Sequence, residues 1–344
     1  MYKLLLLGPR VRIDNPKIIG GTVVLFEQLI SDLKKEDVEI EVINTNIKKS
    51  FINIYFSYLF ILLKVIVKVK KYDHISLHGS TRGFVYLGFG VALISKIFNI
   101  KASMRKFAGD FAEVYKSSGF ISGLLIKFVL KYSDIIFFET KSQLKYFSKF
   151  NKNIFWFPNV RRRKLYPKIP RYFNKKYIYI GQLKKTKGIE EILKVSTLLE
   201  KDYLIDIFGP IVDEEYGKEY FDNFNVNYKG ALRFEEVIEK LNNYDILLLP
   251  TYYEGEGYPG IIVEAYSLGI PVITTRWKAI PEIVDDYITG ILIKPNNVLE
   301  LKNAIEYFNE DNYNELSRNA YNIFDYFDSE KRTKLFLNDI FKNL

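Results

Sequence analysis

The sequence contains no cysteine and only two histidines among its 344 residues. Without cysteine the chain can form neither disulfide bonds nor thiolate metal sites. Two histidines also argue against the usual nitrogen-rich zinc site. No aspartate-any-aspartate motif occurs anywhere in the chain. We therefore expect no bound metal ion and no resident cofactor.

The chain also has no long, uncharged hydrophobic run. The nearest is residues 51–69, which contain Lys64 and Lys68 and are followed by two more charged residues. Lysines in these places favour a helix that lies on a surface over one that crosses a membrane. A helix inside the first domain, with its lysines at the solvent-exposed edge, is an equal alternative. The apolar run at residues 4–7 is too short for a signal peptide, so we expect a cytoplasmic protein.

Positive charge is unevenly distributed along the chain. Residues 1–170 hold 29 Lys+Arg and 12 Asp+Glu, a net charge of +17, whereas the remaining residues hold 21 and 29, a net charge of −8. A basic half can attract nucleic acid or an anionic membrane surface. The aromatic residues form no base-stacking motif, which argues against nucleic acid. Peripheral contact with the inner face of the cell membrane is the hypothesis that remains.

The most informative segment is residues 245–275, DILLLPTYYEGEGYPGIIVEAYSLGIPVITT. Its first six residues, 245–250, are almost wholly apolar and end in proline, as in a strand buried on both faces of a parallel sheet. A glycine-rich loop follows, then Pro259 at a first helical position and Gly269 just past the helix end. The next strand begins at once. In open α/β sheets, ligands bind at the carboxyl ends of such strands.

Two carboxylates, Glu256 in the loop and Glu264 about one turn into the helix, are placed to face that ligand position. Ionised oxygens accept strong hydrogen bonds from sugar hydroxyls and from a ribose diol. The free N–H groups of the helix start favour anions, and the glycines allow close approach of the backbone. The alternative is a pair of solvated glutamates beside an ordinary turn.

This segment resembles the signature of retaining glycosyltransferase family 4, which has the GT-B fold. The resemblance rests on the seven residues between Glu256 and Glu264, on the glycines and on the strand entry Gly-Ile-Pro-Val. In that family the first glutamate lies by the transferred sugar and the second binds the ribose of a nucleotide sugar. The resemblance implies that the loop between them also contacts the donor: Gly257, Tyr258, Pro259 and Gly260.

Two further segments are expected to contact the donor diphosphate. Gly20 and Gly21 follow the first strand and precede a helix, where backbone amides can hold a phosphate, although a flexible turn is the commoner use of such a pair. Residues 181–188, GQLKKTKG, resemble the family's diphosphate clamp. Lys187 matches its lysine, but Gln182 stands where the family has arginine and cannot neutralise charge. Lys184 is a candidate for the missing cation, and a solvated lysine is as good an interpretation.

The acceptor side has weaker signals. Relatives often place a histidine after a central strand near the acceptor, and residues 103–115 contain none. Arg105, Lys106 and Asp110 are the polar candidates there. Asp110 could orient or deprotonate an acceptor hydroxyl, or could cap a helix. His78, at the end of a predicted strand, is the remaining candidate, and a structural role is the commoner one for such a histidine.

The fold class predicted from alternating strands and helices is α/β, with two Rossmann-like doubly wound domains. We expect an acceptor-side domain at residues 1–165, a donor domain at 172–324, and a basic, proline-bearing linker at 161–176. The resemblance implies a cleft between the domains and a final helix, at about residues 325–344, that crosses back to the first domain. The predicted strands are residues 4–8, 38–43, 74–77, 101–105, 135–139, 177–180, 204–208, 226–228, 245–250, 271–275 and 290–293.

The resulting hypothesis is a metal-independent hexosyltransferase. It would move a sugar with retention from a nucleotide-diphosphate sugar to a saccharide or lipid-linked saccharide, as in lipopolysaccharide or capsule biosynthesis. Two alternatives stay open: a nucleotide-sugar epimerase of the same fold and a non-catalytic sugar-binding protein. A nicotinamide-dependent oxidoreductase is disfavoured because the Gly-x-Gly-x-x-Gly turn is missing after the first strand.

Overall fold

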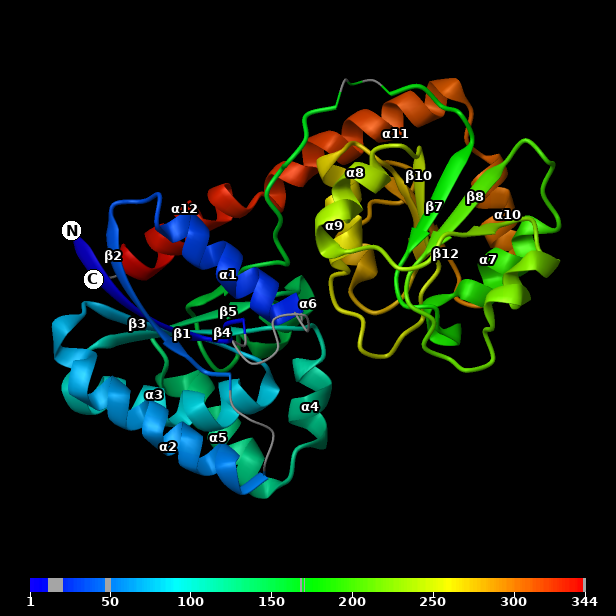
Figure 1. Cartoon of the computed structure of the whole chain (residues 1–344). Coiled ribbons are helices and arrows are strands. Elements are labelled where there is room, and N and C mark those ends of the chain that lie inside the picture. The colour runs from blue at the N-terminus through cyan, green and yellow to red at the C-terminus, as the bar shows by residue number, and fades with distance from the viewer. Residues whose placement is uncertain (12–20, 47–50, 168, 170, 343–344) are drawn as a thin grey trace. The chain divides into compact units, whose positions relative to one another are not determined.

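The eleven predicted strands, together with a twelfth at residues 154–156, form two parallel six-stranded sheets in the computed structural model, which describes residues 1–11, 21–46, 51–167, 169 and 171–342 (Figure 1). The chain divides into two compact units. Unit 1 comprises Met1–Val160 and Ser329–Leu344, and unit 2 comprises Arg161–Asp328. The α/β class with two doubly wound sheets is therefore confirmed.

Unit 1 has the strand order β2-β1-β3-β4-β5-β6, with every neighbouring pair parallel. Its strands are β1 (Tyr2–Gly8), β2 (Val38–Asn44), β3 (His74–Gly79), β4 (Lys101–Lys106), β5 (Ile135–Phe138) and β6 (Ile154–Trp156). Its helices are α1 (Gly21–Leu33), α2 (Phe51–Lys68), α3 (Gly88–Phe98), α4 (Phe111–Ser117), α5 (Phe120–Tyr132), α6 (Lys141–Phe147) and α12 (Ser329–Phe341).

The four leucines of β1 show why this sheet is covered on both faces. Side chains alternate along a strand, and Leu4 and Leu6 pack in a cluster with residues of α1 and α12, such as Phe26 and Phe336. Leu5 and Leu7 pack in a second cluster that includes residues of α2, α3 and α5. A continuous apolar run is the pattern of such a doubly covered strand. The predicted return of the last helix to the first domain is also confirmed.

Unit 2 has the strand order β12-β11-β10-β7-β8-β9, again parallel throughout. Its strands are β7 (Lys176–Ile180), β8 (Leu204–Phe208), β9 (Asn227–Tyr228), β10 (Ile246–Leu249), β11 (Val272–Thr275) and β12 (Gly290–Ile293). Its helices are α7 (Ile189–Ser196), α8 (Val237–Leu241), α9 (Gly260–Ser267), α10 (Val298–Glu306) and α11 (Glu310–Ile323).

The basic segment expected as a linker, residues 161–176, is grouped with unit 2. Arg163 donates to the carbonyls of Ser267 at 2.7 Å and Tyr321 at 3.1 Å. Arg171 donates in the same way to the carbonyls of Asn242 and Tyr244. Charged hydrogen bonds to carbonyls at helix and loop ends satisfy groups that would otherwise lack partners. The arginines thus fix this segment on unit 2.

Candidate functional site

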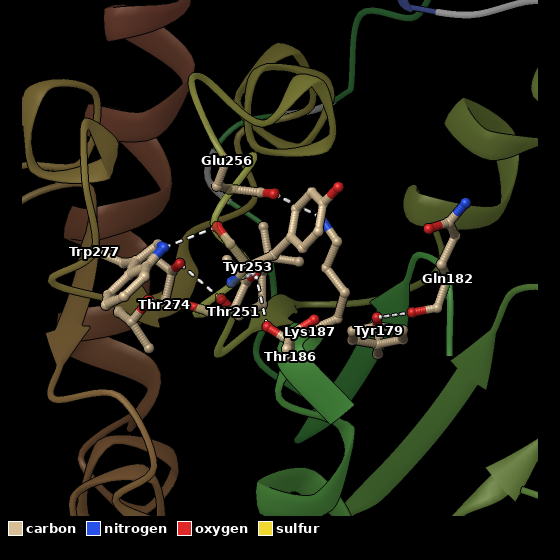
Figure 2. A network of polar contacts seen from close by, with 11 residues as sticks. Tyr179, Gln182, Thr186, Lys187, Thr251, Tyr253, Glu256, Thr274 and Trp277 are labelled. Carbon is tan, nitrogen blue, oxygen red and sulfur yellow. Dashed lines mark hydrogen bonds and ion pairs between the residues drawn. The ribbon is translucent and has the colours of Figure 1, made fainter. Parts of the chain in front are cut away.

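The loop after β10 carries Glu256, and hydrogen bonds hold it against two neighbouring segments (Figure 2). The N–H of Tyr252 donates to the carbonyl of Thr186 at 2.8 Å. The Tyr253 carbonyl accepts from Trp277 Nε1 at 2.8 Å and from the N–H of Glu256 at 3.0 Å. The loop therefore contacts the segment before α7 on one side and the segment after β11 on the other.

Gly188 allows the segment before α7 to approach the end of β10 closely. Its φ is +79°, in the left-handed region that favours glycine. A Cβ at this position would lie 2.2 Å from the carbonyl oxygen of Pro250. Only glycine fits both the backbone conformation and the space, so this residue fixes the position of Lys187 beside the loop.

Glu256 and Lys187 form an ion pair in which Nζ lies 2.6 Å from one carboxylate oxygen and 2.9 Å from the other. Both side chains are mostly buried, with 9% of Glu256 and 17% of Lys187 exposed. The ammonium also lies 4.6 Å from the centre of the Tyr253 ring (Figure 2). The structure thus brings together two predicted donor-site residues from separate loops, because α7 and α9 both begin at the carboxyl edge of the sheet.

Glu264 forms a second ion pair, with Arg161, in which Nε lies 2.6 Å from Oε1. Only 9% of the Glu264 side chain and 16% of the Arg161 side chain are exposed. The guanidinium passes so close to the first residue of α9 that a Cβ on Gly260 would lie 1.9 Å from Nη2. Sequence reasoning missed Arg161, because it placed the run of arginines at residues 161–163 in a linker.

The other predicted donor residues lie around these two ion pairs. Lys184 Nζ is 5.1 Å from the centre of the Tyr253 ring, whereas Gln182 is exposed and its carbonyl accepts from Tyr179 at 2.7 Å. Tyr258 is buried and donates to Glu282 at 2.6 Å. Gly257 lies in the loop, and Pro259 is the residue before the first turn of α9. Ligand contact by any of these residues stays a prediction.

Three candidates in unit 1 are core groups. His78 is fully buried, its Nε2 lies 3.0 Å from Ser76 Oγ, and burial together with the charge of Arg105 holds its pKa well below the ordinary value. Arg105 donates to the Pro158 carbonyl at 3.0 Å, and burial lowers its pKa to about 9. Burial also lowers the pKa of Lys106, whose ammonium lies 3.3 Å from Asp110. Contact of these buried side chains with an acceptor requires the unit to open and stays a prediction.

Asp110 is the accessible member of this group. Its side chain is 44% exposed, and it stands at the N-cap position of α4 without accepting a capping hydrogen bond from a described residue. Its carboxylate is therefore available to solvent near the carboxyl end of β4. Gly21 is the first residue of α1, and a Cβ there would meet no described atom within 4 Å. Gly20 lies outside the described residues.

Within the described ranges, no three His, Asp or Glu side chains are grouped as a metal site would require. Over the same part of the chain, no helix has both the length and the apolar character needed to cross a membrane.

Residues 168–323 match the family model described as glycosyl transferases group 1. This match lies within unit 2, and we call residues 168–323 the group 1 domain. Among curated proteins, the chain is similar to an uncharacterized 41.2 kDa protein in the cps region of Klebsiella pneumoniae, at 30% identity over 39% of this chain and 38% of the relative. It is also similar to the capsular polysaccharide biosynthesis glycosyltransferase CapM of Staphylococcus aureus, at 26% identity over 42% of this chain and 39% of the relative. The matched part thus spans well under half of these relatives.

Solved structures show that the similarity in fold extends beyond the group 1 domain. The structure of HepE from Anabaena in complex with UDP is similar over 100% of both chains, with a TM-score of 0.76 at 14% identity. Sucrose-phosphate synthase from Thermosynechococcus elongatus is similar over 100% of this chain and 99% of its own, with a TM-score of 0.69 at 16% identity. The chain therefore has the GT-B fold, as its sequence predicts.

Proposed function

We propose that this protein is a retaining glycosyltransferase that uses a nucleotide-diphosphate sugar as donor. The observation that carries the proposal is the pairing of each signature glutamate with a cation at the carboxyl edge of a group 1 domain. One pair provides an ammonium for phosphate, and the other provides a carboxylate for ribose. The HepE structures with UDP and UDP-glucose add support, since they share the fold.

Lys187 is the proposed partner of the diphosphate. A nucleoside diphosphate leaves more readily when a fixed positive charge balances the charge that grows on it in the transition state. In the unliganded arrangement this ammonium is balanced by Glu256 instead. When the diphosphate binds, Lys187 exchanges one anionic partner for another, which frees the Glu256 carboxylate to accept hydrogen bonds from the sugar hydroxyls.

Glu264 is the proposed partner of the ribose diol. Arg161 engages Oε1 through Nε, and among the described residues no hydrogen bond to Oε2 is found. A carboxylate has about four lone-pair sites, so Arg161 can orient the group while the second oxygen accepts from the ribose. The N–H groups at the start of α9 supply further donors for an anion.

Retention of configuration is proposed to follow from attack on the same face from which the phosphate leaves. The transition state would carry oxocarbenium character on the sugar, and the departing phosphate would take the acceptor proton. Because Lys187 and the helix start balance the leaving group, the proposed reaction requires no metal. Turnover that persists in the presence of a chelator is the expected result.

The acceptor is proposed to be a saccharide or a lipid-linked saccharide of a cell-surface polysaccharide. The names of several relatives support this class, including an α-1,3-N-acetylgalactosaminyltransferase of Campylobacter jejuni that acts on a diphospho-undecaprenol compound and O-antigen chain mannosyltransferase B of Escherichia coli. A cytoplasmic location also stays a prediction.

The test is a panel of nucleotide sugars, screened with the purified protein for binding and for slow hydrolysis by mass spectrometry. We expect one donor to bind and to release its nucleoside diphosphate in wild type, and turnover to fall in Glu256→Ala. Glu254→Ala is the matched control, since this exposed glutamate lies in the same loop and pairs with Lys278 at 2.8 Å instead. Release of an isomerised free sugar would indicate an epimerase, and failure of the whole panel to bind would refute the donor site.

A further inference from the structure

One layer of unit 1 consists of three helices with a large apolar surface directed away from the core. Helices α2, α3 and α5 pack beside one another on the same face of the sheet, and Figure 1 shows them together in blue to green. Their inner side chains, such as Val65, Val91 and Val129, belong to one buried cluster. Their outer side chains are unusual for a helix layer in contact with water.

The outer face of α2 is formed by exposed large hydrophobic residues. They are Phe56, Leu59, Phe60, Leu63, Ile66 and Val67. Most are spaced three or four residues apart, so they form one stripe along the helix. Val67 is 79% exposed and Phe60 is 59% exposed, while Ile61 and Val65 on the opposite side are buried. The helix is therefore apolar on both its inner and its outer face.

The same pattern continues on the neighbouring helices. Leu93 and Ile97 are exposed on α3, and Phe120, Ile121 and Leu124 are exposed on α5. Phe120 is 83% exposed. Single exposed hydrophobic residues are common on protein surfaces, but a large contiguous apolar patch marks a surface that binds something.

The charge on these helices has one sign. The sequences of α2, α3 and α5 contain no aspartate or glutamate and five lysines: Lys64, Lys68, Lys96, Lys127 and Lys131. Most lie toward the carboxyl ends of their helices, which meet at one edge of the unit because the strands between them are parallel.

A cavity at this edge adds to the basic surface. Lys96 and Lys131 line it together with Lys101 and Lys152, and its volume is about 560 Å³. Asp134 is its acidic member, lying 3.5 Å from Lys96 and 3.4 Å from Lys101. Lysines outnumber carboxylates around the cavity, so this end of the helix layer presents a positive field next to the apolar face.

We propose that the outer face of α2, α3 and α5 is a docking surface for an anionic lipid bilayer. Apolar side chains of a helix that lies in the plane of the membrane enter the boundary between headgroups and acyl chains, and lysines beside them bind lipid phosphates. Lysine stems also allow the ammonium groups to reach the headgroups while the helix body lies deeper. A second copy of the chain would place like charges opposite one another, and therefore fits this face less well.

Membrane docking of unit 1 is independent of the donor site in unit 2, so the two proposals can fail separately. If the protein is the proposed transferase, membrane docking would bring it to the surface where a lipid-linked acceptor is held. Nucleotide-sugar binding should be the same in every docking variant, and thermal unfolding of each variant shows whether unit 1 is folded.

The test is flotation with vesicles of phosphatidylcholine alone or mixed with phosphatidylglycerol. We expect wild type to float with the mixed vesicles at low salt and to be released at high salt. The double variant Phe60→Ser/Leu124→Ser should bind at least tenfold more weakly, and Lys64→Gln/Lys127→Gln/Lys131→Gln about a hundredfold more weakly, from roughly fivefold for each lysine.

Control substitutions lie in unit 2. Leu299 is 65% exposed on α10, so Leu299→Ser matches the apolar change, and Lys294→Gln matches the loss of one lysine. Both should float as wild type does. The proposal is overturned if wild type stays unbound at low salt, or if sedimentation shows a dimer that Phe60→Ser/Leu124→Ser converts to monomer.

Discussion

Replacement of Glu264 by alanine tests the proposed ribose contact most directly. A hydrogen bond to a charged group contributes about 1 to 3 kcal/mol, so nucleotide affinity should fall by roughly 5- to 150-fold. The carboxylate is 9% exposed and lies 2.6 Å from Arg161. Water therefore screens its interactions little, and we expect the upper half of this range.

The same substitution also affects stability. Removing one partner of a buried ion pair costs about 3 to 5 kcal/mol, because the other charge is left without compensation. Arg161 keeps 16% of its side chain exposed, so water can reach it and a cost near the lower limit is expected. Thermal unfolding of the variant with and without nucleotide measures this cost and shows whether the protein is folded in the binding assay.

The assay is titration calorimetry with a nucleoside diphosphate and with its 2′-deoxy analogue. Wild type should bind the deoxy compound more weakly, whereas Glu264→Ala should bind both compounds equally, because the acceptor of the ribose hydroxyl is gone. Arg161→Met is the companion variant: it keeps the carboxylate, so discrimination between the two sugars should persist in part. If folded Glu264→Ala still prefers the ribose form, the assignment of Glu264 is refuted.

The remaining predictions concern turnover and stability. Glu256→Ala should reduce turnover by at least tenfold with a smaller effect on nucleotide affinity, and full activity in a product assay would count against its sugar contact. Gly188→Ala should destabilise unit 2 by about 2 to 4 kcal/mol in denaturant unfolding, because alanine is strained at φ +79° and its Cβ would meet Pro250; wild-type stability would contradict this. Burial lowers the pKa of His74 to about 3 and that of His78 well below 6.5. The unfolded chain therefore binds more protons below pH 6.5, and stability should fall by about 1.4 kcal/mol per pH unit for each histidine as the pH drops. His74→Gln should halve this histidine contribution to the dependence of the unfolding free energy on pH. An unchanged dependence would be evidence against a contribution from His74.

The strands were predictable because their signals are local. Residues 246–249 are all apolar and are followed by Pro250, and β10 is found at Ile246–Leu249. The helix after it begins at Gly260, directly behind the predicted proline. Gly188 was only partly predictable. Its position at the end of the segment 181–188 is visible in the sequence, whereas its close contact with Pro250 depends on a strand about sixty residues further along the chain.

Burial of polar residues was less predictable. His78, Arg105 and Lys106 stand at strand ends, where the sequence suggested contact with a ligand, and the structure encloses all three. Arg105 is enclosed by packing against the Phe157 ring, whose centre lies 3.5 Å from the guanidinium carbon. A side chain at a strand end is accessible only if the following loop leaves it uncovered. The hydrophobic pattern of the sequence predicts strands and helices but not the path of the loops between them.

The sequence by itself determined that two acidic groups stand eight residues apart in a glycine-rich loop and helix, and that this unit lies between two buried strands. These features depend on neighbours along the chain. Only the tertiary structure decided which cations face the two acids. Lys187 is 69 residues from Glu256, and Arg161 is 103 residues from Glu264. Lys187 and Glu256 meet because the parallel strands β7 and β10 bring the loops at their carboxyl ends together. Arg161 lies before β7 and reaches Glu264 because its segment packs on unit 2, so packing rather than spacing in the sequence selects both partners.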